Sequence, residues 1–326
     1  MLVTGGAGFI GSELVRQLVE AGHPVIAIDN LVNGKRENLA EVSAEFVEAD
    51  IRDGDLMAQL LKDTDIVFHL ACLGVRHSIH SPHENHEVNA TATLNLLSLA
   101  KAADVERFVY ISSSEVYGTA QWVPMTEEHP TFPMTVYGAS KLAGECYTRA
   151  FYRTYDYPTV VVRPFNTYGP RCHHEGDSGE VIPKFLLHCM AGQPMIVFGD
   201  GTQTRDFTHV SDTARGIIMA GMADAAIGQT INLGNGREIA INELAAEIAN
   251  VVGRPDTEVK HDIPRPGDVL RLYADMSKAQ TLLGYAPKVS LREGLGLLKE
   301  WYLNSGQTPE KLLEQEIIHN WKTANV

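Results

Sequence analysis

The sequence predicts an α/β fold in which a doubly wound parallel sheet is joined to a second, smaller α/β domain. Two observations lead to this prediction. Short apolar segments alternate with helical patterns through the first half of the chain, and the helical segments between them are long enough to be crossover connections. At 326 residues, 44% of them hydrophobic, the chain can also bury a core large enough for two closely packed domains.

The expected elements of the first domain follow one another as a βαβ series. The strands are predicted at MLVTGG, PVIAID, DIVFHLA, RFVYISS and TVVVRP, and the helices at ELVRQLVEAG, ATLNLLSLAKAA and KLAGECYTRAFYRTY. Continuous apolar strands are typical of a parallel sheet that is covered on both faces. We therefore expect a ligand crevice at the carboxyl ends of these strands.

After about residue 165 the pattern changes to loop-rich sequence with frequent glycine and proline. Strand candidates follow at MIVFG and QTINLG, and helix candidates at SDTARGIIMAGMA, INELAAEIANVVG and LREGLGLLKEWYL. The predicted division is a first domain over residues 1–165, joined by about 206–230, and a second domain over 166–326. The last twenty residues are expected to form a polar helix.

Composition and charge exclude several functional classes. A net charge of −14 would repel a polyanion, so we expect no nucleic-acid partner. The sequence has no run of eighteen apolar residues and begins directly with a strand pattern, so we expect a cytoplasmic protein without a membrane partner. The four cysteines lie far apart without a CxxC pair, which indicates reduced thiols rather than disulfides or a zinc site.

The segment TGGAGFIGS, residues 4–12, has the glycine spacing of a dinucleotide-binding Rossmann turn. Gly5 would allow the tight turn, Gly8 would let backbone N–H groups approach a pyrophosphate, and Gly11 would permit close packing of the helix. Eighteen residues beyond Gly11, the second strand ends in Asp29, whose carboxylate can accept hydrogen bonds from a ribose diol and would repel a 2′-phosphate. The first domain is thus predicted to bind NAD rather than NADP.

A second motif, VYGASK, places Tyr137 and Lys141 four residues apart at the start of a helix. This spacing brings both side chains to one helical face. There the ammonium can lower the pKa of the phenol and hold the cofactor ribose. A tyrosinate formed in this way is a base for a sugar hydroxyl.

Several segments together resemble a known family. They are TGGAGFIGS, DNLVNGKREN, HLA, SSSEVYG, YGASK, RPFNTYGPR and GDGTQTRDFTHVSD, in this order. Over about residues 2–302 the chain resembles extended short-chain dehydrogenases/reductases, in the NAD-dependent nucleotide-sugar epimerase/dehydratase family. UDP-sugar 4-epimerases are the most similar group and UDP-glucuronate decarboxylases the next.

The resemblance implies roles for individual residues. Tyr137 would take the proton of the sugar 4-hydroxyl, Lys141 would tune Tyr137, and Ser113 would hydrogen-bond the same hydroxyl. The implied cofactor contacts are Gly5, Gly8, Phe9, Ile10, Gly11, Asp29, Asn30, Asn33, Gly34, Asp50, Ile51, Leu70, Ala71, Asn89, Tyr137, Lys141 and Pro164. The implied substrate contacts are Asn166, Arg205 and Arg271 on the nucleotide diphosphate, with Arg76 facing a carboxylate or a phosphate.

The residues after Ser113 bear on which reaction is catalysed. Dehydratases of the family carry an Asp-Glu acid–base pair here, and this chain has Ser114-Glu115, which disfavours dehydration. The Ser113-Ser114-Glu115 sequence is close to the Thr-Ser-Glu of the decarboxylases, whereas the loop around Arg76 resembles that of epimerases. We retain Glu115 among the catalytic candidates, although in an epimerase it would mainly shape the site.

The sequence is therefore interpreted as an isomerase: an NAD-dependent 4-epimerase of a UDP-hexose or UDP-hexuronate that works through a transient 4-keto intermediate. The alternatives are a UDP-glucuronate decarboxylase and, as a non-enzyme, an NAD-sensing regulatory protein. The resemblance also implies a homodimer that pairs helices near residues 85–102 and 138–153. Histidines recur at 77, 80, 83 and 86, but Pro82 interrupts them, so no metal site is predicted.

Overall fold

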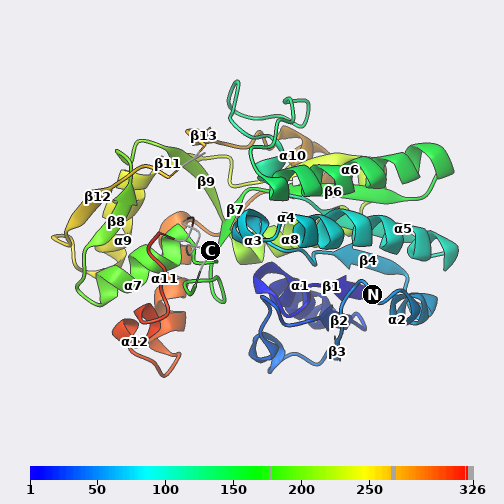
Figure 1. Ribbon diagram of the computed structural model, residues 1–326, viewed down its shortest axis with the longest axis horizontal. Coiled ribbons are helices and arrows are strands. Elements are labelled where there is room, and N and C mark those ends of the chain that lie inside the picture. The colour runs from blue at the N-terminus through cyan, green and yellow to red at the C-terminus, as the bar shows by residue number, and fades with distance from the viewer. Residues whose placement is uncertain (177, 266–268, 320, 322–326) are drawn as a thin grey trace.

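The computed structural model describes residues 1–176, 178–265, 269–319 and 321. Its largest element is a seven-stranded sheet with the order β10-β6-β5-β4-β1-β2-β3, in which all neighbouring strands are parallel (Figure 1). The strands are β1 (Leu2–Thr4), β2 (Ile26–Asp29), β3 (Glu45–Glu48), β4 (Ile66–His69), β5 (Arg107–Ile111), β6 (Thr159–Pro164) and β10 (Thr230–Leu233).

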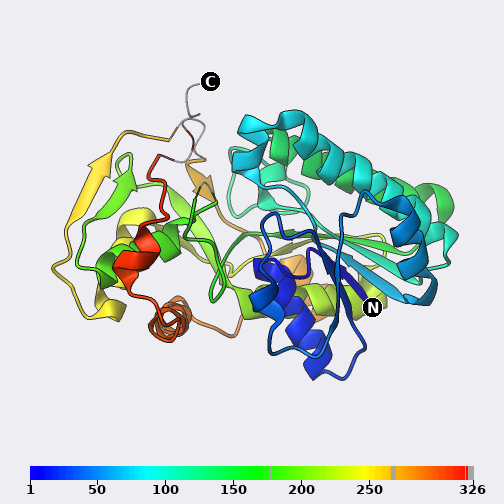
Figure 2. The same ribbon diagram turned by 60° about the horizontal axis from the view of Figure 1, so that its bottom comes forward.

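Helices cover both faces of this sheet (Figure 2). One face carries α1 (Phe9–Glu20) and α8 (Val210–Met222), which pack against each other, and α10 (Ser277–Leu283) lies beside α8 and β10. The other face carries α2 (Gly54–Leu60), α5 (Ala92–Ala102) and α6 (Val136–Tyr155). The short helices α3 (Val75–His80) and α4 (Pro82–His86) and a π-helical segment (Glu87–Thr91) lead into α5.

Successive residues of a β-strand point to opposite faces of the sheet, so neighbouring residues of one strand pack in the two different cores. Val3 and Val109 pack in the core beneath α1 and α8, whereas Leu2 and Phe108 pack in the core beneath α5 and α6. All four side chains are fully buried. The prediction of a doubly wound parallel sheet is confirmed.

The rest of the chain forms smaller sheets with their own core. β9 (Thr204–His209) pairs with β7 (Asn166–Tyr168), β11 (Glu238–Ala240) and β13 (Arg271–Leu272), and β8 (Met195–Phe198) pairs with β12 (Val259–Asp262). The helices here are α7 (Val181–Met190), α9 (Ile241–Val252), α11 (Leu291–Leu303) and α12 (Pro309–Leu313). Short 3₁₀ turns occur at Arg36–Leu39, Leu61–Asp63, Ser114–Val116 and Asp224–Ala226.

Two features differ from the sequence-based expectation. The edge strand β3 has the sequence EFVE, and because its two ends are polar it was not recognised as an apolar run. Among the described strands it pairs only with β2. The C-terminal helix expected over residues 307–326 is present only as α12, which begins at Pro309 after the cap Thr308 and ends at Leu313, and it is wrong for residues 314–319 and 321; residues 320 and 322–326 lie outside the described residues. The described residues after it form turns and one isolated bridge.

The chain returns to the main sheet after leaving it, since α8 packs on α1 and β10 lies at the sheet edge. The domain boundaries given above stay a prediction. No helix in the described part of the chain has the length and apolar character needed to span a membrane.

Candidate active site

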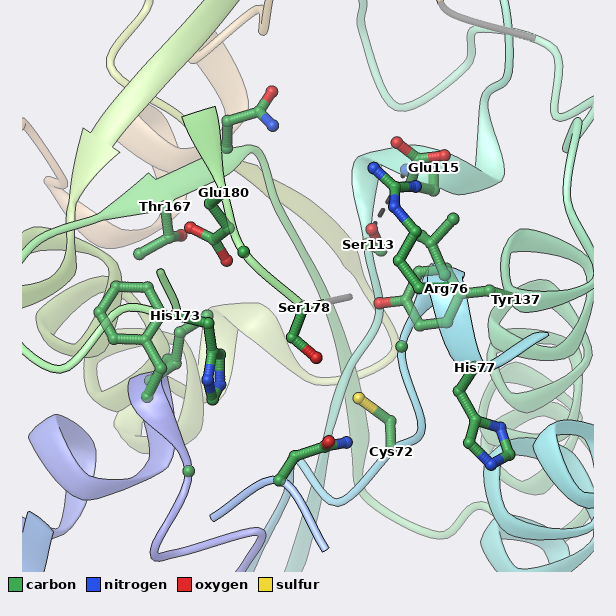
Figure 3. Close-up of a pocket in the computed structure, with 18 of the residues that line it drawn as sticks. Cys72, Arg76, His77, Ser113, Glu115, Tyr137, Thr167, His173, Ser178 and Glu180 are labelled. Atoms are coloured by element: carbon green, nitrogen blue, oxygen red, sulfur yellow. Dashed lines mark hydrogen bonds between the residues drawn. The ribbon is translucent and has the colours of Figure 1, made fainter. Parts of the chain in front are cut away.

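A cavity of about 810 Å³ lies at the carboxyl ends of the parallel strands. Residues that follow β1, β2, β4 and β5 line one part of it, and residues of β9 and α7 line another. This is the edge at which open parallel sheets bind their ligands. The close-up in Figure 3 shows side chains that converge on the cavity from both parts of the molecule.

The glycine turn between β1 and α1 forms one wall of the cavity. Gly5 has a φ of +69°, and a Cβ on this residue would lie 2.8 Å from the backbone nitrogen of Ala71. Gly8 donates from its N–H to the carbonyl of Gly5 at 3.1 Å and precedes the first residue of α1. The turn therefore requires glycine, and it presents the amino end of a helix to the cavity, as a pyrophosphate site does.

Asp29 ends β2 at the same wall. Its carboxylate accepts hydrogen bonds from the backbone N–H of Leu31 at 2.8 Å and of Ala7 at 3.1 Å. Burial raises the pKa of Asp29, and these two hydrogen bonds act in the opposite direction. The carboxylate is thus fixed beside the glycine turn with remaining acceptor capacity, so these residues fit the adenosine ribose of a dinucleotide.

Tyr137 and Ser113 lie together on another wall (Figure 3). Thr135 caps α6 by accepting from the N–H of Gly138 at 3.0 Å, which places Tyr137 in the first turn of the helix. Burial raises the pKa of the Tyr137 hydroxyl well above its ordinary value, while a hydrogen bond with Ser113 lowers it. In this structure burial outweighs the lowering expected from Lys141.

Lys141 lies one turn after Tyr137 on α6 and is almost completely buried. Its Nζ donates to the carbonyl oxygen of Ile111, the last residue of β5, at 2.6 Å and lies 4.6 Å from the ring centroid of Tyr110. Burial lowers its pKa. The side chain is held between the end of a central strand and the cavity that it lines.

Glu115 lies in the 3₁₀ turn that follows β5, and its N–H donates to the Ser113 Oγ at 3.2 Å. Its carboxylate is close enough to Tyr137 to raise the pKa of that phenol. Glu115, Ser113 and Tyr137 therefore share one wall of the cavity.

Glu180 lies on the opposite side of the cavity, near Thr167, His173 and Ser178 (Figure 3). Burial raises the pKa of Glu180 to about 7, against the opposing effect of His173 and Arg76. Arg76 comes from α3, on the side of the main sheet. Tyr137 and Glu180 thus border the cavity from two sides, and Glu180 can exchange a proton near neutral pH.

The structure brings nearly all the predicted site residues to this cavity. Those that line it are Gly5, Gly8, Phe9, Ile10, Gly11, Asp29, Asn30, Asn33, Gly34, Asp50, Ile51, Leu70, Ala71, Arg76, Ser113, Glu115, Tyr137, Lys141, Pro164, Asn166 and Arg205. Their roles stay predictions.

Two predicted residues do not line the cavity in the described structure. Asn89 is fully buried, where its Nδ2 donates to the Leu73 carbonyl at 2.9 Å and its Oδ1 accepts from the Leu73 N–H at 2.8 Å. Asn89 therefore supports a cavity-lining loop from behind. Arg271 is exposed, and its guanidinium pairs with Glu238 on β11 of the same sheet.

Arg265, six residues before Arg271, lines the cavity instead. Arg205 reaches the same region and donates to the carbonyl of Val269 at 2.7 Å. The sequence offered no means to choose between Arg265 and Arg271, because the position of Arg271 depends on how β13 pairs with β9.

Other cavity residues were not predicted. Cys72 makes a hydrogen bond with Tyr137, and its position directly after the HLA motif was the available signal. Glu180 and Trp321 lie far from any recognised motif, and only the folded chain brings them to the cavity. Among the described residues, no three histidine, cysteine, aspartate or glutamate side chains gather as metal ligands would.

Comparisons with known proteins agree with this geometry. The chain matches the family described as GDP-mannose 4,6 dehydratase over residues 2–297. It is 39% identical to a putative UDP-glucose 4-epimerase of Methanocaldococcus jannaschii, over 94% of this chain and 100% of that protein. It is 40% identical to the UDP-glucose 4-epimerase of Mycolicibacterium smegmatis, over 94% and 99% of the two chains.

A solved structure is also similar. The UDP-glucose 4-epimerase of Thermotoga maritima, determined with UDP-glucose, superposes with a TM-score of 0.89 at 35% identity, over 94% of this chain and 99% of that one. The similarity covers both the main sheet and the smaller sheets, because so little of either chain is left out.

Proposed function

Because the chain belongs to the GDP-mannose 4,6-dehydratase-type family of extended short-chain dehydrogenases/reductases, we propose that it is an NAD-dependent 4-epimerase of a nucleotide-diphosphate sugar. The observation that carries the proposal is the placement of Tyr137, hydrogen-bonded with Ser113, in one cavity with the glycine turn and Asp29. A UDP-hexose is the substrate class that the relatives favour, since those named above are UDP-glucose 4-epimerases.

The proposed cofactor site uses the glycine turn for the pyrophosphate, Asp29 for the adenosine ribose and Lys141 for the other ribose. Bound NAD⁺ would accept the hydride from C4 of the sugar and return it to the opposite face of the same carbon. Asp29 supports NAD over NADP, because a second phosphate on the ribose would meet a fixed carboxylate.

Residues of the chain itself transfer the proton of the sugar 4-hydroxyl. Tyr137 takes the proton of the 4-hydroxyl as the C4–O bond becomes a carbonyl, and it returns the same proton when the hydride comes back. Lys141, one helical turn away, stabilises the phenolate, and Ser113 orients the hydroxyl. Both the hydride and the proton return to the sugar in this cycle, so the cofactor ends as it began.

The substrate side is proposed to use Asn166, Arg205 and Arg265 for the nucleotide diphosphate, because guanidinium groups bind phosphate oxygens strongly. Arg76 lies close enough to Glu180 to lower the pKa of that carboxyl.

Decarboxylation of a UDP-uronate is the second candidate, and the Ser113-Ser114-Glu115 sequence favours it. In that reaction the 4-ketone would make the C5 carboxylate a β-keto acid, and a solvent proton would replace CO₂ at C5. Epimerisation by a returned hydride introduces no solvent proton at carbon.

The test is incubation with UDP-glucose, UDP-galactose, UDP-N-acetylglucosamine, UDP-glucuronate and dTDP-glucose in D₂O, with the products identified by NMR. We expect the C4 epimer of at least one of these sugars, with every ring carbon free of deuterium. Deuterium at C5 of a pentose product from UDP-glucuronate would establish the decarboxylase instead.

We also propose that the protein works in the cytoplasm as a homodimer. All four cysteines are free, as expected in a reducing compartment. The helices α5 and α6, which cover the predicted pairing region, pack against each other on one face of the main sheet. Light scattering after gel filtration would measure the mass, and a value near that of one chain would refute the dimer.

A further inference from the structure

The C-terminal segment, which consists of the residues after α11, lies outside the family match. The family match ends at residue 297, and the chain continues through α12 and on to Trp321. In Figure 2 this segment, drawn in red, passes alongside the smaller sheets rather than away from the molecule. Three of its residues, Glu316, Ile318 and Trp321, line the cavity described above.

The segment is fixed to α7 by several contacts. Glu316 accepts from His188 Nε2 at 2.6 Å, and its other oxygen lies 3.4 Å from the Nζ of Lys184. Lys184 also donates to the carbonyl of Ile317 at 2.7 Å. These groups are largely buried, so the contacts resist exchange with water.

A second attachment lies farther along the segment. His319 Nε2 lies 2.9 Å from a carboxylate oxygen of Asp262, the last residue of β12. Upstream, the N–H of Gly176 donates to the carbonyl of Gln315 at 2.8 Å. The segment is therefore held at several points along its length, and its position does not depend on α12 alone.

These attachments bring Trp321 to Phe198, the last residue of β8. The two rings meet edge to face, with centroids 4.6 Å apart and an interplanar angle of 89°. The guanidinium of Arg265 lies 5.3 Å from the Trp321 centroid and 5.6 Å from the Phe198 centroid. Two aromatic rings and a cation thus gather at the end of the cavity, in the half formed by the smaller sheets.

This chemistry suits a nucleobase. Aromatic side chains bind bases by stacking, and a guanidinium adds a cation–π contact and hydrogen-bond donors. Arg205 and Arg265 lie in the same half of the cavity and suit the attached diphosphate. The glycine turn and Asp29, which suit the cofactor, belong to the main sheet instead.

On the basis of the proposed function, we propose that Trp321, held over the cavity by the C-terminal segment, binds the base of the nucleotide-sugar substrate. The C-terminal segment is then part of the substrate site. The part of this site that binds the nucleotide is completed by residues that lie beyond the family match. Phe198 and Arg265, which contact the Trp321 ring, form the adjoining part of the same surface.

The test is calorimetric binding of UDP and of inorganic pyrophosphate to the full-length protein saturated with NAD⁺. Since pyrophosphate has no base, it reports the phosphate contacts alone. Trp321→Ala should raise the Kd for UDP about tenfold and leave the Kd for pyrophosphate unchanged. Trp321→Phe should retain most of the affinity for UDP, because a ring remains.

The matched control is Trp122→Ala, since Trp122 is half exposed and does not line the cavity. It should bind both ligands as the wild type does. An unchanged Kd for UDP in Trp321→Ala would overturn the inference. So would tighter binding of UDP, which would mean that the indole occupies the place of the base, or an equal loss for UDP and pyrophosphate, which would mean a structural role only.

If the proposed function were wrong, the results would differ from those that overturn the inference about Trp321. Wild-type protein that binds UDP and loses affinity in Trp321→Ala, but epimerises none of the sugars, would support the inference and refute the epimerase. Active wild-type protein with an unchanged Trp321→Ala affinity would refute the inference alone.

Discussion

The guanidinium of Arg163 donates two hydrogen bonds to the carboxylate of Glu145, at 2.8 and 2.6 Å, and both side chains are almost completely buried. Glu145 lies one turn after Lys141 on α6, and Arg163 directly precedes Pro164 at the end of β6. The pair joins the helix that carries Tyr137 to the strand that ends beside the cavity. The orientation of the candidate catalytic residues therefore depends on an ion pair outside the cavity.

Removing one partner of this pair should destabilise the protein strongly. Glu145→Gln leaves the guanidinium of Arg163 buried without its counter-charge, which costs about 3–5 kcal/mol. Urea unfolding followed by circular dichroism would measure the loss. Arg149→Ala is the control, because Arg149 pairs with the same carboxylate at 2.9 Å from a partly exposed position, and it should cost less than about 1 kcal/mol. Equal losses in the two variants would contradict this account.

Tyr137→Phe should retain the fold and bound cofactor but lose about a hundredfold or more in kcat, as removal of a positioned acid–base group does. The control is Tyr155→Phe, on the same helix but exposed to solvent. Steady-state kinetics on the substrate found by NMR would compare the two variants. Turnover of Tyr137→Phe near that of the wild type would refute the proton-transfer role.

Glu115→Gln distinguishes the two candidate reactions. In an epimerase Glu115 has no proton to move at C5, so kcat should fall by less than about tenfold. In a decarboxylase the loss should reach about a hundredfold, because Glu115 would help the step at C5. The kcat of Glu115→Gln should be compared with that of the wild type on UDP-hexoses and on UDP-glucuronate. A large loss of kcat with a UDP-hexose would show that Glu115 takes part in epimerisation.

The position of Asp29 leads us to expect tighter binding of NAD⁺ than of NADP⁺. The carboxylate is held by the N–H groups of Ala7 and Leu31 and cannot easily turn away from a 2′-phosphate. Calorimetry on protein freed of bound nucleotide should give a Kd for NADP⁺ at least about tenfold higher, which corresponds to about 1.4 kcal/mol. Equal affinities would remove the role given to Asp29.

Glu180 should make stability depend on pH. Burial raises its pKa to about 7, so between its ordinary pKa of 4.5 and pH 7 the folded protein binds more protons there than the unfolded chain. The free energy of unfolding should therefore decrease as the pH rises through this range, and the decrease should be smaller in Glu180→Gln. Urea unfolding of both proteins at pH 5 and pH 8 would measure the difference. A wild-type protein that lost no more stability than Glu180→Gln would contradict the raised pKa.

The sequence predicted the main sheet and most of its site because these features are local. A buried parallel strand is recognisable from its own apolar residues, and the positive φ of the turn at Gly5 by itself favours glycine. The spacing of Tyr137 and Lys141 likewise fixes them to one face of α6. For such residues the secondary structure already determines the neighbourhood.

Arg271 and Arg265 show where this reasoning stops. Both are arginines in the same loop-rich stretch. The pairing of β13 with β9 puts Arg271 at the surface beside Glu238, whereas Arg265 lines the cavity. The same applies to the pKa of Tyr137: the four-residue spacing predicts a lowering by Lys141, but the burial that raises it results from packing of the whole site. Pairing partners and desolvation are properties of the folded chain.

The amino-acid sequence by itself thus determined the parallel α/β architecture, the dinucleotide-type turn with Asp29, and the positions of Ser113, Tyr137 and Lys141. Only the tertiary structure decided that Glu180 faces the cavity from the opposite side, and that Trp321 returns to Phe198 across more than a hundred residues of sequence. The physical reason is the difference in sequence distance over which the two kinds of interaction act. Helical and strand periodicity act over a few residues, whereas the contacts that bring Trp321 to the cavity are ion pairs and hydrogen bonds between segments whose proximity exists only after the sheets have assembled.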